Sequence, residues 1–300
     1  MKALYQTDCR EWLIFKGGTS LSKGFNIIER FSEDIDLAIS HSFFGIEKSN
    51  KSQRDKLKKL ARKYIHETLS AQIDAHLKSM GVTGYTIENV TQVQDKNGEW
   101  KPIDSDKDPT VILLHYPSII EDTITYIPPR VKIEISCLSM DEPTEERYIH
   151  SLIGETFEEE DIDANCKIRT VVPTRTFLEK IFLLAEEFQK DKPRSVRMSR
   201  HLYDLEKLMD TEYGREALAD RTLYDAIVEH RRAYYALKYV NYDLHAPSTI
   251  NFLISEHSME SWKADYADMR RFFIYGQSLE FDELMQKISE LQKRVRDMAK

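Results

Sequence analysis

The segment DIDLAI, residues 34 to 39, constrains the fold more than any other stretch of the sequence. Ile35, Leu37 and Ile39 alternate with other residues, which predicts a strand with one apolar face. Asp34 and Asp36 fall on the opposite face, roughly 6.6 Å apart along the backbone. Like charges on one face repel each other, and a divalent cation such as Mg²⁺ removes that repulsion by binding both carboxylates. A solvated polar face is the simpler alternative.

A glycine-rich turn precedes this strand. The segment FKGGTSLSKGF, residues 15 to 25, contains the pair Gly17 and Gly18 followed by Thr19 and Ser20. A Walker P-loop requires a lysine directly after its last glycine, whereas the lysine here comes before the glycine. The dinucleotide-binding pattern G-x-G-x-x-G also fails, because the two glycines are adjacent. Two interpretations remain, an ordinary strand-to-helix turn and a phosphate-binding turn of another kind.

The order of a Gly-Gly turn, a short helix and a strand with Asp-x-Asp resembles the nucleotidyltransferase superfamily of the DNA polymerase beta type. Over FKGGTSLSKGFNIIERFSEDIDLAIS the sequence is similar to the AbiEii/AbiGii toxin family, which has a KGGT-x-L turn and then R-x-S-x-D-[IL]-D-[LF]. The 15 residues between Gly18 and Asp34 exceed the general superfamily interval but suit the toxin family. The resemblance covers residues 11 to about 210 well and the remainder only loosely. Family members usually have a helical segment before the first strand, so we expect a short N-terminus here.

A third carboxylate lies in RVKIEIS, residues 130 to 136. The apolar residues Val131, Ile133 and Ile135 alternate with polar ones, which predicts a strand with Glu134 on its polar face. Metal-dependent nucleotidyl transfer generally needs a third acid near the metal that activates the attacking hydroxyl. Glu134 is the candidate for that role, although the superfamily more often has Asp there. The alternative is an ordinary salt bridge in the neighbourhood of Lys132.

A predicted helix in PTRTFLEKIFLLAEE, residues 173 to 187, provides a candidate lysine. Thr176 and Glu179 have the spacing of a capping box, which predicts that the helix begins at Thr176. Lys180 lies beside the apolar stripe of this helix, where its ammonium could reach phosphate oxygens or simply extend to solvent.

A second helical pattern follows in KPRSVRMSRHLYDLEKLM, residues 192 to 209. Its predicted buried stripe consists of Met198, Leu202, Leu205 and Met209. A separate polar stripe is predicted from 3.6 residues per turn and consists of Arg197, Arg200, His201 and Asp204. An ion pair between Arg200 and Asp204 would be the plainest account of that stripe.

These two segments match the later motifs of the toxin family, a helix lysine followed by R-[DH]-x-x-D-L. The resemblance implies that Lys180 and Asp204 are active-site residues. His201 stands where many members have Asp.

The composition excludes several other classes of protein. The chain has 300 residues and a formal charge of −8, which argues against a protein that coats nucleic acid over its whole surface. Its three cysteines form no CxxC pattern, so we expect no structural zinc. No apolar run reaches the roughly 18 residues of a membrane span, and the N-terminus does not resemble a signal peptide. We therefore expect a cytoplasmic protein that is not in the membrane.

The fold class expected is α+β, with a nucleotidyltransferase core at residues 1–172 and a helical C-terminal domain at 173–300. The core would contain a mixed β-sheet with flanking helices. A long helix is predicted over residues 52–80, ending at Gly81. Strands are predicted at residues 11–15, 35–39, 85–93, 111–116, 130–136 and 167–172.

The resemblance implies a two-metal nucleotidyltransferase that moves NMP from an NTP to an acceptor hydroxyl. Asp34, Asp36 and Glu134 would hold Mg²⁺ or Mn²⁺. The nucleotide would be bound by Gly17, Gly18, Thr19, Ser20, Lys180 and Arg197.

In that family the activity serves as the toxin of a type IV AbiE-like toxin–antitoxin system in phage defence. A tRNA is the favoured acceptor, and a winged-helix antitoxin encoded nearby is the implied partner. Two alternatives stay open, a transferase that modifies a protein or a small molecule, and a non-catalytic nucleotide-binding module of the same fold.

Overall fold

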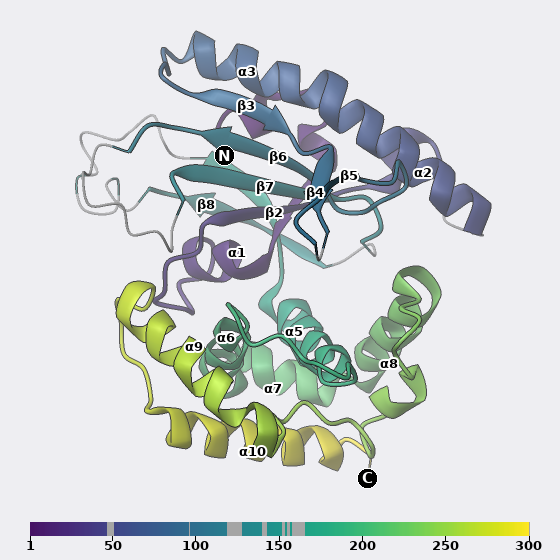
Figure 1. Ribbon diagram of the computed structural model, residues 1–300, viewed down its shortest axis with the longest axis vertical. Coiled ribbons are helices and arrows are strands. Elements are labelled where there is room, and N and C mark those ends of the chain that lie inside the picture. Colours follow the sequence, from purple (N-terminus) through teal and green to yellow (C-terminus); the bar gives the residue numbers. More distant parts are fainter. Residues whose placement is uncertain are drawn as a thin grey trace. The chain divides into compact units, whose positions relative to one another are not determined.

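The computed structural model describes residues 1–46, 51–95, 97–118, 128–139, 143–151, 154, 157 and 166–299. The chain forms two compact units (Figure 1). The first unit consists of Met1–Gly24 and Glu33–Thr170, and the second of Phe25–Ser32 and Val171–Lys300. The chain therefore enters the second unit for eight residues, Phe25–Ser32, between the glycine turn and the Asp-x-Asp strand. No sequence pattern predicted this crossing.

A seven-stranded mixed sheet organises the first unit, in the order β3-β6-β7-β2-β1-β9-β8. The central strand β2 pairs antiparallel with β1 and parallel with β7. The mixed sheet was predicted from the sequence and is confirmed. The strands span β1 Leu13–Lys16, β2 Asp34–Ile39, β3 Thr86–Asn89, β6 Thr110–His115, β7 Arg130–Ser136, β8 Thr144–Ile149 and β9 Cys166–Val171.

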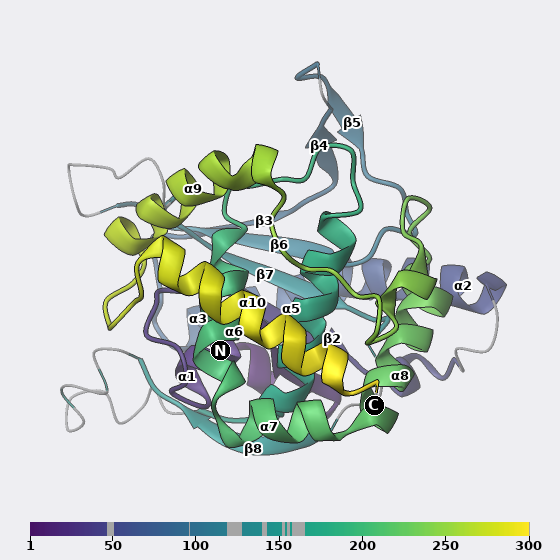
Figure 2. The same cartoon turned by 90° about the horizontal axis from the view of Figure 1, so that it is seen from below.

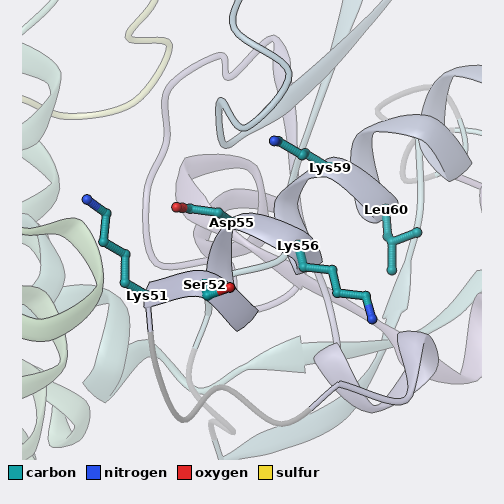
Figure 3. Close-up of a pocket in the computed structure, with 6 residues that line it drawn as sticks. All are labelled: Lys51, Ser52, Asp55, Lys56, Lys59 and Leu60. Carbon is teal, nitrogen blue, oxygen red and sulfur yellow. The ribbon is translucent and has the colours of Figure 1, made fainter.

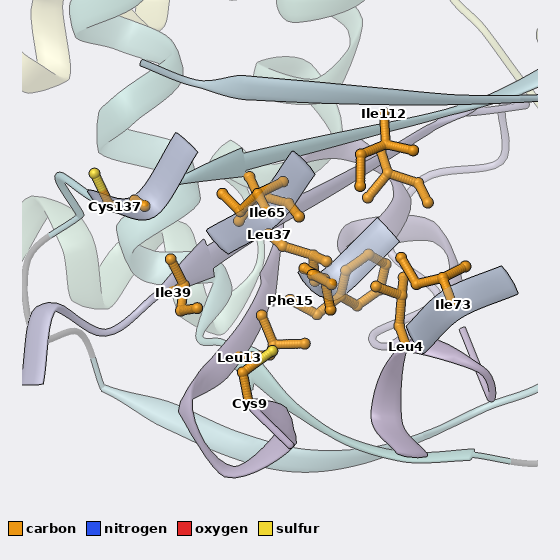
Figure 4. Packing of buried hydrophobic residues seen from close by; sticks show 14 of the residues in the cluster. Leu4, Cys9, Leu13, Phe15, Leu37, Ile39, Ile65, Ile73, Ile112 and Cys137 are labelled. Atoms are coloured by element: carbon orange, nitrogen blue, oxygen red, sulfur yellow. The ribbon is translucent and has the colours of Figure 1, made fainter. Parts of the chain in front are cut away.

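Helices α2 (Lys51–Tyr64) and α3 (Ser70–Ser79) cover the apolar face of this sheet (Figure 1). Figure 4 shows the core between them, where Leu13, Phe15 and Leu37 pack with Ile65 and Ile73. The predicted helix over residues 52–80 is thus confirmed in outline. A π-helical segment, Ile65–Leu69, joins its two parts, and the helix ends before Gly81, whose φ is +75°.

A two-stranded hairpin stands apart from the main sheet. It pairs β4 (Gln92–Gln94) with β5 (Trp100–Pro102) in antiparallel register, and Figure 2 shows it extending away from the seven strands. The single strand predicted at residues 85–93 was wrong, because the chain leaves the sheet after Asn89 and begins β4 at Gln92. Strand β5 was not predicted because it is only three residues long, and strand β8 was not predicted because four of its six residues, TEERYI, are polar or charged.

Helices make up most of the second unit, and all described strands end by Val171, as the sequence predicted. Helix α5 (Pro173–Glu187) is buried around nearly its whole circumference, including Phe177, Ile181 and Leu184. The other helices are α6 Ser199–Met209, α7 Glu212–Ala219, α8 Arg221–His230, α9 Met259–Phe272 and α10 Phe281–Asp297. None of the described helices has the length and apolar character needed to cross a bilayer.

The predicted capping box at Thr176 was wrong. Helix α5 begins at Pro173, three residues earlier, because proline suits the first turn of a helix, where its missing N–H is not needed. Glu179 instead forms ion pairs with Arg175 and Arg231. The start of α6 also differs from the predicted polar stripe, since Arg197 precedes the helix.

Candidate active site

The glycine turn lies directly against one of the predicted metal ligands. Gly17 adopts φ +81°, a left-handed conformation that glycine accepts without a steric penalty. A Cβ atom at Gly17 would lie 2.0 Å from the Asp36 Oδ2 atom, so no larger residue fits. The turn and the Asp36 carboxylate are therefore packed together, and this close approach explains why the motif needs glycine at this position.

Thr19 and Ser20 use their hydroxyls to hold this turn in place. Thr19 Oγ1 donates to the backbone oxygen of Asp34, and Ser20 Oγ donates to the backbone oxygen of Gly17 at 2.9 Å. Ser20 is fully buried. Helix α1 (Gly17–Lys23) is only seven residues long, so any ligand at this turn would be bound by local N–H groups rather than by a large helix dipole.

The parallel pairing of β2 with β7 sets the carboxylates side by side. Asp36 is the Cα partner of Glu134, and Asp34 is the partner of Lys132. On the other side, Lys16 of β1 is opposite Asp36. Register partners point to the same face of a sheet, so one polar face carries Asp34, Asp36 and Glu134 together. The apolar faces predicted for β2 and β7 are confirmed, because Leu37 and Ile39 of β2 lie in the core with Ile133 and Ile135 of β7.

The chemistry of this donor set fits Mg²⁺ or Mn²⁺, because carboxylate oxygens are the ligands that hard cations prefer. Glu134 Oε1 forms a salt bridge with Lys132 Nζ at 2.6 Å. Within the part of the chain that the structure describes, no three acids, histidines or cysteines are gathered closely enough to enclose an ion. The three carboxylates thus share one face without converging on one point.

In the second unit, a buried carboxylate joins two cations. Asp204 on α6 has no exposed side-chain area, and it accepts two hydrogen bonds from Arg30, from Nε and Nη2, both at 2.7 Å. The same carboxylate binds Lys180 Nζ of α5 at 2.8 Å. Arg200, the i,i+4 partner considered as an alternative for Asp204, is not among these contacts. We call Arg30, Lys180 and Asp204 the buried triad.

Charge and burial act in opposite directions within this triad. Burial would raise the pKa of the Asp204 carboxyl, but the charges of Arg30 and Lys180 outweigh it and hold that pKa below its usual range. Burial lowers the pKa of the Lys180 ammonium, and the Asp204 charge opposes this shift. Since both carboxylate oxygens already accept charged donors, Asp204 is suited to positioning Lys180 rather than to accepting a proton.

The loop before α6 is also held by a buried carboxylate. Arg197 has φ +60°, which is uncommon for a residue with a side chain and costs of order 1 kcal/mol. Asp265 of α9 accepts hydrogen bonds from the backbone N–H of Arg197 and, at 3.0 Å, from that of Ser199. The Arg197 guanidinium lies 5.7 Å from the centre of the Phe273 ring. Strained residues held this firmly are often functional, which keeps Arg197 a candidate.

His201 is buried beside the triad, and no hydrogen-bond partner of its Nδ1 atom is found among the described residues. Burial, followed by the charges of Lys180 and Arg200, moves its pKa well below 6.5. The imidazole is therefore neutral at pH 7. It does not supply the negative charge of the aspartate that many members of the resembled family have at this position.

Sequence reasoning did not assign roles to Arg30, Lys16 or Asp265. Arg30 and Lys16 both lie inside motifs that the sequence made conspicuous, so their positions were visible although their partners were not. Asp204 is 174 residues away from Arg30, and no local pattern encodes such a pairing. Asp265 lies on α9, outside the motifs described in the sequence.

We predict that Asp204→Asn lowers the free energy of unfolding by about 3–5 kcal/mol, because removing one partner of a buried ion pair leaves the other charges uncompensated. Urea unfolding measures this change. Asp268→Asn, at an exposed position on α9, is the matched control and should change stability by less than about 0.5 kcal/mol. Equal stabilities for the two variants would contradict the structural role of Asp204.

A second prediction concerns pH. Because the pKa of His201 is lower in the folded protein than its value of about 6.5 in the unfolded chain, its contribution to stability is complete above pH 6.5. That contribution decreases as the pH falls, since the unfolded state then binds the extra proton. Between pH 7 and 5.5, His201→Gln should lose about 1 kcal/mol less stability than the parent. The exposed control His257→Gln should follow the parent curve, and identical curves for all three proteins would refute the prediction.

The family of this chain follows from a match to one family model. The family model described as nucleotidyl transferase AbiEii toxin, type IV TA system, matches residues 1–287. Among solved structures, the chain is similar to MenT4, a nucleotidyltransferase toxin from Mycobacterium tuberculosis H37Rv, with 16% identity, a TM-score of 0.38, and coverage of 95% of this chain and 84% of that one. A search of curated proteins gives no match. Since the family model spans nearly the whole sequence, the chain belongs to the AbiEii family of nucleotidyl transferase toxins of type IV toxin–antitoxin systems.

Proposed function

We propose that this toxin transfers NMP from an NTP to a hydroxyl group of RNA, with tRNA the favoured acceptor, and releases pyrophosphate. The observation that carries the proposal is the register of β2 and β7, which sets Asp36 beside Glu134 while Gly17 packs on the Asp36 carboxylate. An acidic face next to a glycine turn combines a place for metal ions with a place for phosphates. Both are needed to bring a triphosphate and a hydroxyl together.

Asp34, Asp36 and Glu134 are the residues proposed to hold two Mg²⁺ or Mn²⁺ ions. When bound, such ions would lower the pKa of the attacking hydroxyl and neutralise charge on the phosphates. Lys132 would have to release Glu134, and its half-buried side chain would then have to turn towards solvent. The Asp36 carboxylate already packs directly against the turn at Gly17.

The glycine turn is proposed to bind the β- and γ-phosphates through the backbone N–H groups of Gly17 and Gly18 and of the residues that follow. Backbone N–H groups at such a turn attract anions because they point outward without intrahelical partners. Thr19 is proposed to help bind the phosphates, and its hydroxyl also donates to the backbone oxygen of Asp34. Ser20 is proposed to help chiefly by fixing the turn, through its hydrogen bond to the backbone oxygen of Gly17.

Lys180 and Arg197 are proposed to neutralise the negative charge that builds up on the triphosphate. An ammonium has three N–H donors, and the contact with Asp204 occupies one of them. Arg30 and Asp204 hold the Lys180 side chain in one orientation, so we assign Asp204 to positioning within the proposed site. We also propose that a winged-helix antitoxin is the partner of this toxin in the cell and that the pair acts in phage defence.

The metal assignment makes a direct prediction. Asp36→Asn should reduce transfer of labelled nucleotide by at least about 100-fold, since each loss of about 1.4 kcal/mol of transition-state stabilisation is tenfold in rate. It should also remove growth inhibition when the toxin is expressed in bacteria. Glu88→Gln, on the exposed edge strand β3, is the control and should leave both unchanged. Retention of transfer and toxicity by Asp36→Asn would show that the site has been placed wrongly.

The identity of the acceptor needs its own experiment. Purified toxin is incubated with cell extract, Mg²⁺ and each labelled NTP in turn, and the products are then treated separately with ribonuclease and with protease. Loss of the labelled product to ribonuclease alone supports an RNA acceptor. Loss to protease alone would replace RNA by a protein acceptor, and a label that survives both treatments would indicate a small molecule.

A further inference from the structure

Helix α2 carries far more positive charge than the rest of this acidic chain. It contains seven lysines and arginines but only one acid, Asp55. Several of these cations are engaged with their own unit: Lys58 pairs with Asp55 and Asp106, Lys63 pairs with Glu67 at 4.0 Å, and Arg62 donates to the backbone oxygen of Val90 at 3.3 Å. Leu57 and Ala61 anchor the opposite side of the helix in the core. Lys51, Lys56 and Lys59 are exposed on this firmly packed helix.

Three lysines form the outward face, which we call the lysine face: Lys51, Lys56 and Lys59. All three are exposed, and no ion pair of theirs is found within the described ranges of the chain. They line an open hollow of about 740 Å³ together with Ser52, Asp55 and Leu60. Figure 3 shows the three ammonium groups spread apart along the helix rather than directed at one point. Such a spread suits a string of negative charges better than one compact anion.

This arrangement opposes the preferences of an isolated helix. Lys51 lies in the first turn, where the helix dipole favours acids, and α2 has no acid there. Lys56 and Lys59 are three residues apart, a spacing at which like charges repel. Helix α10 follows the opposite rule, with Asp282 and Glu283 in its first turn. A local rule broken without benefit to the fold is typical of a functional surface.

An exposed aromatic side chain lies on the hairpin that is rooted on the same helix. Trp100 of β5 is 64% exposed. The chain just before the hairpin contacts α2 through Val90 and Arg62, and the chain just after it contacts α2 through Asp106 and Lys58. Tryptophan is costly to leave in water, and proteins that bind single-stranded nucleic acid combine such stacking platforms with basic grooves.

We propose that the lysine face of α2 and Trp100 form a binding surface for single-stranded RNA. The lysines contact successive phosphates, and the indole stacks on an unpaired base. The inference rests on the proposed function in one respect, namely that RNA is the acceptor. The surface would hold a part of the RNA other than the reacting hydroxyl. Single-stranded RNA matches both features, because its phosphates fit the separated lysines and its unpaired bases fit the indole. An acidic protein partner is an outcome that the experiments below distinguish.

The test measures binding of a fluorescein-labelled single-stranded 12-nucleotide RNA by fluorescence anisotropy at several salt concentrations. Lys56→Glu/Lys59→Glu in the full chain should weaken binding at least about tenfold, and the slope of log Kobs against log salt should fall by about 1.4, because each phosphate contact to a single strand contributes about 0.7. Trp100→Ala should weaken binding roughly tenfold without changing that slope, since stacking releases no counterions.

Two control proteins keep this test specific. Lys263→Glu/Lys293→Glu makes the same change in charge at exposed positions of α9 and α10 and should alter the Kd less than threefold. Lys56→Gln/Lys59→Gln tests the same surface without adding negative charge and should give the same fall in slope. If the α2 variants bind RNA like the α9 and α10 control, or if the parent binds no RNA, the inference is wrong.

The outcome is separable from that of the proposed function. Asp36→Asn should bind this RNA as the parent does, because it does not alter the lysine face. Lysine-dependent RNA binding by a parent that labels only protein would overturn the RNA acceptor and leave the surface standing. Normal RNA labelling by the α2 variants, with unchanged RNA binding but lost binding of the antitoxin, would overturn the surface and assign it to the protein partner.

Discussion

The buried carboxylate of Asp204 is the interaction on which most of the candidate chemistry of the second unit depends. It holds Lys180 from one helix and Arg30 from a segment that lies 174 residues earlier in the chain. A lone buried charge would be too costly to keep, so each member of the triad requires the others. The same contact therefore fastens the segment Phe25–Ser32 to α6 and fixes the lysine that the family motif makes conspicuous.

The first unit uses backbone geometry rather than buried charge to prepare its candidate site. Parallel pairing of β2 with β7 aligns the acids, and the left-handed Gly17 allows the turn to approach Asp36. These are constraints of register and of space. Strand register and the Gly17 turn align the acidic side chains by themselves. The acidic face is therefore formed even though Glu134 pairs with Lys132.

Much of this could be predicted from the sequence because it is local. Alternation revealed β2 and β7 and the faces of Asp36 and Glu134, and helical spacing revealed the buried stripe of α6, including Leu202 and Leu205. What could not be predicted involves partners far apart in sequence or competing local signals. Pro173 overrode the apparent capping box at Thr176, and the buried state of Lys180 follows from a carboxylate on another helix.

The excursion of the chain through the second unit has a consequence for the order in which the protein can be completed on the ribosome. Arg30 pairs with Ile274 in an isolated bridge, and the N–H of Phe31 donates to the backbone oxygen of Phe273 at 2.7 Å. The stretch between the glycine turn and the Asp-x-Asp strand thus obtains these backbone partners only after α9 has been synthesised. A nascent chain that already carries both candidate motifs can bind this linker to Asp204 of α6, but it lacks the backbone partners of the linker until α9 is complete. A product truncated before α9 would therefore carry both motifs without these backbone hydrogen bonds.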